Sequence, residues 1–253
     1  MTADILHMED GDAIAYLRAK GFSDEVKAIK DIKLLAETPF RQYIQDIINY
    51  SALSPSPSDS LNNLEKIASK AGEDVIRLLC GDNNSLRQLV FISGSSNFLS
   101  NILAKNGSGT DYLFKGKGLY IKKELETFSA ELEEAIKESK WSYGSNDHLK
   151  YIARTLRLYR EREYLRIGAR DILNIASMAE TTLELSDLAS ACLDAACRFC
   201  LEKLKGDYGI PVYIDFDGTK QESEFVIIGM GKLGGRELNF SSDIVIGSKI
   251  CII

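Results

Sequence analysis

Several residue types that mark particular classes of protein are scarce in this chain. Its 253 residues contain only two histidines, one tryptophan and four prolines. His7 and His148 are too far apart to form a catalytic pair, so a serine nucleophile activated by histidine is not expected. No apolar run approaches the roughly 20 residues that a membrane-spanning helix needs, so we expect no membrane partner.

Cysteine is also used sparingly, and its pattern excludes a disulfide framework. The five cysteines are an odd number, and no secretory signal peptide is recognised, which indicates a reducing, cytoplasmic location. Cys197 and Cys200 match C-x-x-C, but they stand inside a helical pattern with no second pair and no nearby histidine. We interpret them as small apolar residues on a packed helix face and not as metal ligands.

Positive charge does not dominate, which argues against nucleic acid as a partner. The chain has 31 lysines and arginines against 37 acidic residues, for a net charge of −6. Proteins that bind nucleic acid generally carry a basic footprint, so we expect no nucleic-acid partner. The remaining composition, 45% hydrophobic and 27% charged, is that of an ordinary globular protein with one or two domains.

Amphipathic helical periodicity covers most of the chain up to residue 205. Helix start and stop signals bound these segments, including the capping residue Asp24 and the glycines at 21 and 206. The stretch Ser54–Ser58, with two prolines, is interpreted as a short connection. The predicted helices cover residues 10–20, 24–37, 39–50, 61–71, 124–139, 146 to the 170s and 180–205, with short pieces up to 106.

The pattern changes from helix to strand after Gly206. Strands are predicted at 211–215, 225–228 and 244–246, with a turn at Asp217-Gly218. Asp215 and Asp217 form a D-x-D, but the adjacent glycine favours solvated turn residues over a metal pair. The predicted fold is therefore mostly α with a C-terminal α+β part: a helical region over 1–205 and an incomplete catalytic domain over 206–253.

The richest motif is the glycine-containing stretch Gly229–Asp243, which follows the predicted strand at 225–228. Glycines let backbone N–H groups approach an anion closely. Lys232 and Arg236 can neutralise phosphate charge, and Asp243 offers a hard oxygen ligand to Mg²⁺. The combination predicts a site for phosphate and metal.

Three nucleotide-binding patterns compete for this stretch. A dinucleotide fold needs a helix, another strand and an acidic residue about 20 positions further on, and no carboxylate follows Asp243. A P-loop needs Ser or Thr after its lysine, but Leu233 follows Lys232. The spacing suits a nucleotidyltransferase of the DNA polymerase β type, in which carboxylates on the following strand hold Mg²⁺.

A second basic feature lies on the long helix predicted from 146 to the 170s. Arg162, Arg166 and Arg170 share one helix face because they stand four residues apart. They can form a stripe that faces phosphate, which arginine binds through paired hydrogen bonds. They can also pair with interleaved acidic residues such as Glu163 and Asp187, which the pattern favours.

Three stretches, 229–243, 162–171 and 180–189, resemble the glutamine synthetase adenylyltransferase family, also called glutamate-ammonia ligase adenylyltransferases. The resemblance implies a polymerase-β-type fold that uses Mg²⁺, ATP or ADP, and phosphate. Family members carry two such domains: one removes AMP from a tyrosine of glutamine synthetase and the other adds it. By the position of the motif and by the residues at 239–242, this chain resembles the N-terminal, AMP-removing half. The implied partners are glutamine synthetase and the PII signal protein.

The resemblance also assigns roles to residues of this sequence. Asp243 is the implied catalytic and metal-binding residue. The implied phosphate- and nucleotide-binding residues are Gly231, Lys232, Gly234, Gly235, Arg236, Ser241 and Ser242.

The chain departs from the family pattern directly after Asp243. The family continues Asp-Ile-Asp, whereas Val245 stands here at the position of the second carboxylate. Because one carboxylate holds Mg²⁺ poorly, we expect a truncated chain that is inactive alone. The alternative interpretation is a helical interaction module that has lost catalysis and binds glutamine synthetase or a signal protein.

Overall fold

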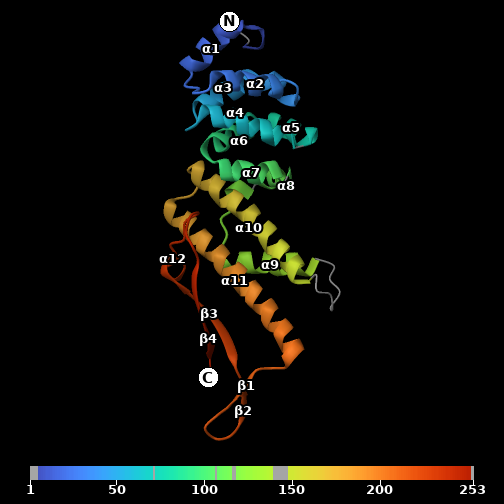
Figure 1. Ribbon diagram of the computed structural model, residues 1–253, viewed down its shortest axis with the longest axis vertical. Coiled ribbons are helices and arrows are strands. Elements are labelled where there is room, and N and C mark those ends of the chain that lie inside the picture. The colour runs from blue at the N-terminus through green and yellow to red at the C-terminus, as the bar shows by residue number, and fades with distance from the viewer. Residues whose placement is uncertain (1–4, 71, 106, 116–117, 139–147, 252–253) are drawn as a thin grey trace. The chain divides into compact units, whose positions relative to one another are not determined.

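The computed structural model describes residues 5–70, 72–105, 107–115, 118–138 and 148–251 (Figure 1). Helices make up most of these residues, and two small antiparallel hairpins follow at the C-terminal end. This confirms the predicted fold class, mostly helical with a C-terminal β-containing part. The predicted helix start near Asn146 and the last two residues of the chain lie outside the described residues.

The chain packs as two compact units. One comprises Met1–Ile121 with Tyr164–Ala176, and the other comprises Lys122–Glu163 with Ser177–Ile253. Helix α10 (His148–Ile172) contributes residues to both. The predicted division into 1–205 and 206–253 follows secondary structure and not these packing units, and it stays a prediction.

The first unit is built from short helices. Its elements before α10 are η1 (Ile5–His7), α1 (Asp10–Ala19), α2 (Glu25–Leu35), η2 (Pro39–Tyr43), α3 (Ile44–Ala52), α4 (Pro57–Ala68), α5 (Glu73–Cys80), α6 (Asn83–Ser95), α7 (Asn97–Lys105), α8 (Gly107–Thr110), the π-helical turn η3 (Asp111–Lys115) and η4 (Gly118–Tyr120).

Local signals set several of these helix ends. The Asp24 carboxylate accepts a hydrogen bond from the Lys27 N–H at 3.0 Å and caps α2 as predicted. Gly21, with φ +86°, follows α1. Helix α4 begins at Pro57 and not at Leu61 as predicted, because proline is well tolerated in the first turn, where its missing N–H has no helical partner.

Helix α4 supplies much of the core of the first unit. Leu61, Leu64 and Ile67 are fully or almost fully buried, and α4 packs against α2, α6 and α7. Its buried polar residues are satisfied by the backbone of α6: the Ser60 hydroxyl donates to the Val90 carbonyl at 2.8 Å. Burial of three such aliphatic side chains contributes about 1.5–3 kcal/mol each relative to exposure.

The second unit contains α9 (Leu125–Glu138), the first part of α10 and α11 (Met178–Tyr208), followed by the hairpins. A capping box starts α11: the Glu180 N–H donates to the Ser177 hydroxyl, and the Glu180 carboxylate accepts from the Ser177 N–H. The helix ends at Tyr208, beyond the predicted end at Gly206, with Gly209 at φ +85° after it.

The C-terminal strands form two separate hairpins. Strand β1 (Val212–Ile214) pairs with β2 (Lys220–Glu222) across the predicted Asp217-Gly218 turn. Strand β3 (Glu224–Met230) pairs with β4 (Val245–Cys251), from Met230 opposite Val245 to Glu224 opposite Cys251. The residues after Asp243 therefore pair with the strand before the glycine-rich turn within the same chain.

The helical part is expected to fold without the hairpins. A chain ending at Tyr208 keeps α9, α10 and α11, and it loses strands whose side chains are largely exposed. Far-ultraviolet circular dichroism should retain the helical signal, with cooperative urea unfolding. A non-cooperative or largely unfolded product would show that the predicted boundary near residue 205 is wrong.

Candidate functional site

The glycine-rich turn between β3 and β4 is compact, and two of its glycines are required by geometry. Gly231 has φ +57° and begins α12 (Gly231–Gly234). A Cβ atom on Gly234 would lie 2.6 Å from the Gly229 carbonyl oxygen, which no side chain tolerates. The Gly235 N–H donates to the Gly231 carbonyl at 2.9 Å. The close return of the backbone onto the end of β3 explains these glycines.

Two polar contacts join the turn to helix α11. Arg236 Nη2 lies 2.6 Å from Asp187 Oδ1, and the Asp187 side chain is only 5% exposed. The Leu238 N–H donates to the Ser186 hydroxyl at 3.0 Å. Leu233 and Leu238 are buried. The structure thus brings together two of the family-like stretches, 229–243 and 180–189.

The second part of the motif folds around Asn239. Its side-chain oxygen accepts hydrogen bonds from the Ser242 hydroxyl at 2.6 Å and from the Ser241 N–H at 3.2 Å. Asn side chains often close turns in this way. Both serine hydroxyls point to Asn239, since Ser241 Oγ also lies 3.2 Å from its Oδ1. The sequence analysis predicted that the two serines bind phosphate, and it did not identify Asn239 as their hydrogen-bond acceptor.

The predicted charged ligands are placed on the surface. Lys232 and Asp243 are both exposed, one on α12 and the other just before β4. Across the described residues, no group of three or more His, Cys, Asp or Glu side chains could hold a metal ion. A Mg²⁺ ion at Asp243 would therefore draw its other ligands from water and substrate phosphates, as Mg²⁺ commonly does. The residues fit a metal–nucleotide complex better than a free metal ion.

The second D-x-D, in the β1–β2 hairpin, is a turn. Asp217 accepts hydrogen bonds from the Thr219 N–H at 2.9 Å and the Thr219 hydroxyl at 2.6 Å. The Thr219 hydroxyl holds the pKa of the Asp217 carboxyl below its usual value. Both Asp215 and Asp217 are exposed. The interpretation as turn residues is confirmed.

Two of the arginines on α10 are buried structural donors of the first unit. Arg166 is fully buried, and its Nη1 donates to the Ile121 carbonyl at 2.6 Å. Arg170 Nη1 donates to the Leu119 carbonyl at 3.2 Å. Both residues hold the chain segment after η4. The hypothesis of a stripe that faces phosphate is therefore wrong for Arg166 and Arg170, because their guanidinium groups face backbone carbonyls in the interior.

The third arginine joins a buried charge network in the second unit. Arg162 contacts Glu163 at 3.2 Å and Glu131 of α9 at 3.1 Å, so ion pairing, the favoured interpretation, is confirmed here. Lys123 lies between the same carboxylates, 2.6 Å from Glu131 and 3.0 Å from Glu163. The Lys123 N–H also donates to Glu184 at 2.8 Å. No sequence pattern pointed to Lys123, because its partners are distant in the chain.

Two of the cysteines of α11, Cys192 and Cys197, are partly buried. Burial raises the pKa of Cys192 to about 11, and desolvation also raises the pKa of Cys197. A raised thiol pKa leaves little thiolate at neutral pH, so neither is a reactive nucleophile. Cys200 is exposed, so the predicted packed position is wrong for this residue, and it forms no disulfide within the described part of the chain. Among the described helices, none is both long enough and apolar enough to cross a bilayer.

The Arg236–Asp187 ion pair is expected to hold the glycine-rich turn on α11. Arg236→Ala leaves a buried carboxylate without its charged partner, which costs about 1–3 kcal/mol. Amide hydrogen exchange over residues 231–243 should accelerate about tenfold or more. Arg198→Ala is the matched control, because its pair with Asp194 is exposed. Equal exchange in both variants would mean that the turn is held by Leu233 and Leu238 alone.

Comparison with known proteins relates this chain to the adenylyltransferases. It belongs to the glutamate-ammonia ligase adenylyltransferase family, which it matches over residues 86–247. The matched region contains all three stretches that carry the resemblance. The predicted family is therefore confirmed.

Individual relatives are much longer than this chain. It is 36% identical over 158 residues to a protein of Shewanella loihica, which covers 62% of this chain and 15% of that protein. It is 28% identical over 246 residues to one of Thioalkalivibrio sulfidiphilus, covering 92% and 25%. Both are named bifunctional glutamine synthetase adenylyltransferase/adenylyl-removing enzyme. The chain spans a quarter or less of the length of these curated relatives.

Proposed function

We propose that this chain is part of the N-terminal, adenylyl-removing half of a bifunctional glutamine synthetase adenylyltransferase. The observation that carries the proposal is the fifteen-residue turn 229–243, fixed to α11 through Ser186 and Asp187. The long helical region before the turn and the amino acids at 239–242 support assignment of the chain to the N-terminal half. The targets are then glutamine synthetase and, for regulation, the PII signal protein, in the cytoplasm and in nitrogen metabolism.

The reaction of that half is phosphorolysis. An oxygen of inorganic phosphate attacks the phosphorus of the AMP group on tyrosine, the bond to the tyrosine oxygen breaks, and ADP and a tyrosine hydroxyl result. Backbone N–H groups at 231–234 and the exposed Lys232 would receive the phosphates, whereas the Gly235 N–H already donates to the Gly231 carbonyl. Asp243 would anchor Mg²⁺, which neutralises charge on the transferred group when bound.

The other proposed ligands need a rearrangement to act on phosphate. Arg236 is engaged with Asp187, and the hydroxyls of Ser241 and Ser242 point to Asn239. Arg236 remains 58% exposed, so a phosphate can reach the guanidinium from the solvent side. The serine N–H groups and hydroxyls can be released to phosphate only at the cost of the Asn239 contacts.

The second candidate function is a catalytically inactive helical module that binds glutamine synthetase or a signal protein. Val245 favours it, because this residue replaces the second carboxylate of the family pattern and is exposed at the start of β4. In that case the helices alone bind the partner protein, and the glycine-rich turn has no role in binding or catalysis.

Calorimetric titration with ADP and Mg²⁺ separates the two candidates. The proposed site predicts binding that weakens about tenfold in Lys232→Ala and in Asp243→Asn, with Lys220→Ala in the exposed hairpin as the control. Val245→Asp should increase the Mg²⁺ dependence, but only while Asp243 is present. Binding to glutamine synthetase without any nucleotide binding would favour the helical module.

A further inference from the structure

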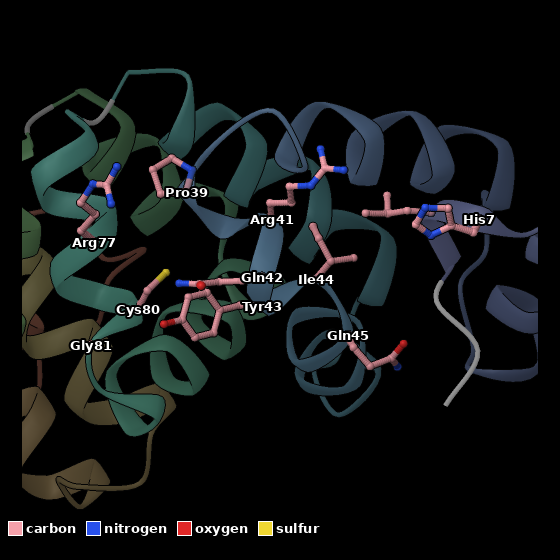
Figure 2. A pocket seen from close by; sticks show the side chains of 11 residues that line it. His7, Pro39, Arg41, Gln42, Tyr43, Ile44, Gln45, Arg77, Cys80 and Gly81 are labelled. Carbon is pink, nitrogen blue, oxygen red and sulfur yellow. The ribbon is translucent and has the colours of Figure 1, made fainter. Parts of the chain in front are cut away.

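A cavity of about 910 Å³ lies in the first unit, far along the chain from the glycine-rich turn (Figure 2). It is lined by η1, η2, the first residues of α3, and the end of α5 with Gly81. Its volume is in the range of small-molecule sites. The residues that line it precede the stretch 86–247 that matches the family, and the proposed function makes no use of them.

The described residues that line this cavity include two arginines. Arg41 from η2 and Arg77 from α5 both line it, with Pro39 between them in the view of Figure 2. None of the described residues that line it is Asp or Glu, and the carboxylate next to Arg77 is that of Glu73, which lies one turn earlier on α5.

Neither arginine forms a buried ion pair within the described residues. Arg41 is exposed and has no ion pair within the part of the chain that the structure describes. Arg77 lies 3.5 Å from Glu73 one turn earlier on α5, and both side chains are largely solvent-exposed. Such exposed pairs contribute little, about 0–1 kcal/mol. Both guanidinium groups can therefore turn to an incoming anion at small cost.

The other walls supply polar groups and an apolar base. His7, Gln42 and Tyr43 add polar groups, while Ile44 and Cys80 are buried. Burial raises the pKa of the Cys80 thiol to about 11, so it stays neutral at pH 7 and does not repel an anion. The cavity thus joins two cations and several donors to an apolar surface.

We propose that this cavity binds a small multivalent oxyanion, a metabolite that carries phosphate or carboxylate groups, held by Arg41 and Arg77. Guanidinium groups bind both anions through paired, charge-assisted hydrogen bonds. A cavity walled by three separate chain segments favours a compact small molecule over a protein segment, which needs an extended surface.

Calorimetric titration of the full chain with pyrophosphate, and separately with succinate, tests the proposal. At least one probe should bind, and which one binds identifies the phosphate or the carboxylate class. Arg41→Ala and Arg77→Ala should each weaken that binding about tenfold or more. Both residues are exposed, so the variants should fold like the parent chain, which circular dichroism checks.

Two control variants separate this cavity from the rest of the surface and from the glycine-rich turn. Arg87→Ala removes an exposed arginine of the same unit that does not line the cavity, and Lys232→Ala removes the lysine of the proposed nucleotide site. Both control variants should still bind the probe at the cavity, whereas Arg41→Ala should not. The proposal is overturned if neither probe binds, if Arg41→Ala and Arg77→Ala both leave the binding unchanged, or if Lys232→Ala removes the binding and Arg41→Ala does not.

Discussion

Replacing Lys123 with alanine is expected to lower the free energy of unfolding of the second unit by about 3–5 kcal/mol. The Lys123 side chain is 3% exposed and lies between two carboxylates, Glu131 on α9 and Glu163 on α10. Glu163 is fully buried. Removal of the ammonium group leaves like charges close together in a poorly solvated place, with Arg162 as the cation that still contacts both.

The surroundings of the network increase this cost. The Tyr159 hydroxyl donates to Glu131 at 2.9 Å, and burial raises the pKa of Tyr159 far above its usual value, so it stays a neutral donor. It cannot replace a positive charge. Lys123→Met keeps the volume but loses the charge, and we expect it to be destabilising as well, though less so than alanine, because it leaves no cavity.

Urea unfolding followed by circular dichroism measures this effect. Hydrogen exchange over α9 and α11 shows whether the loss belongs to the second unit. Lys137→Ala, on the neighbouring helix α9, is the control, since the pair of Lys137 with Glu133 is exposed and should contribute about 0–1 kcal/mol. A loss in Lys123→Ala as small as that in Lys137→Ala would mean that Arg162 alone neutralises the two glutamates.

The chain is expected to release no AMP from adenylylated glutamine synthetase, even with phosphate and Mg²⁺ in excess. Asp243 is the one carboxylate of the predicted metal pair, and Val245 occupies the second position. Phosphoryl transfer depends on metal ions that neutralise charge on the transferred group, and a single anchor holds Mg²⁺ weakly. Loss of the bound metal should therefore reduce the rate to the background.

Formation of ADP over time is the measurement, and the longer Shewanella loihica relative is a suitable positive control. Phosphate-dependent ADP formation that disappears in Asp243→Asn would contradict the expectation and place catalysis at this turn. Formation that persists in that variant would indicate a contaminating activity.

Local sequence rules predicted the secondary structure of this protein well. Helix periodicity and the capping residue Asp24 act within a few positions, and so do the turn residues Asp217 and Gly218. The glycine-rich turn was also found from sequence, because Gly231 and Gly234 are needed by the backbone itself. The start of α4 was placed too late, since two prolines were taken for a break.

Contacts between distant residues were decided by the tertiary structure. Arg236 was predicted to face phosphate and lies on Asp187, which is 49 positions away. Arg166 and Arg170 have the spacing of a surface stripe, yet burial turns them to backbone carbonyls at 121 and 119. No periodicity could identify Lys123, whose two glutamate partners are 8 and 40 positions away.

The sequence by itself determined the family, the helical character and the glycine-rich turn, because these depend on residue identity and on neighbours a few positions apart. The tertiary structure alone decided which charges are buried and paired, and which cations remain available at the cavity of Arg41 and Arg77. The physical reason is desolvation: the interaction of a charged side chain depends on how much water packing removes, and packing is set by the whole chain.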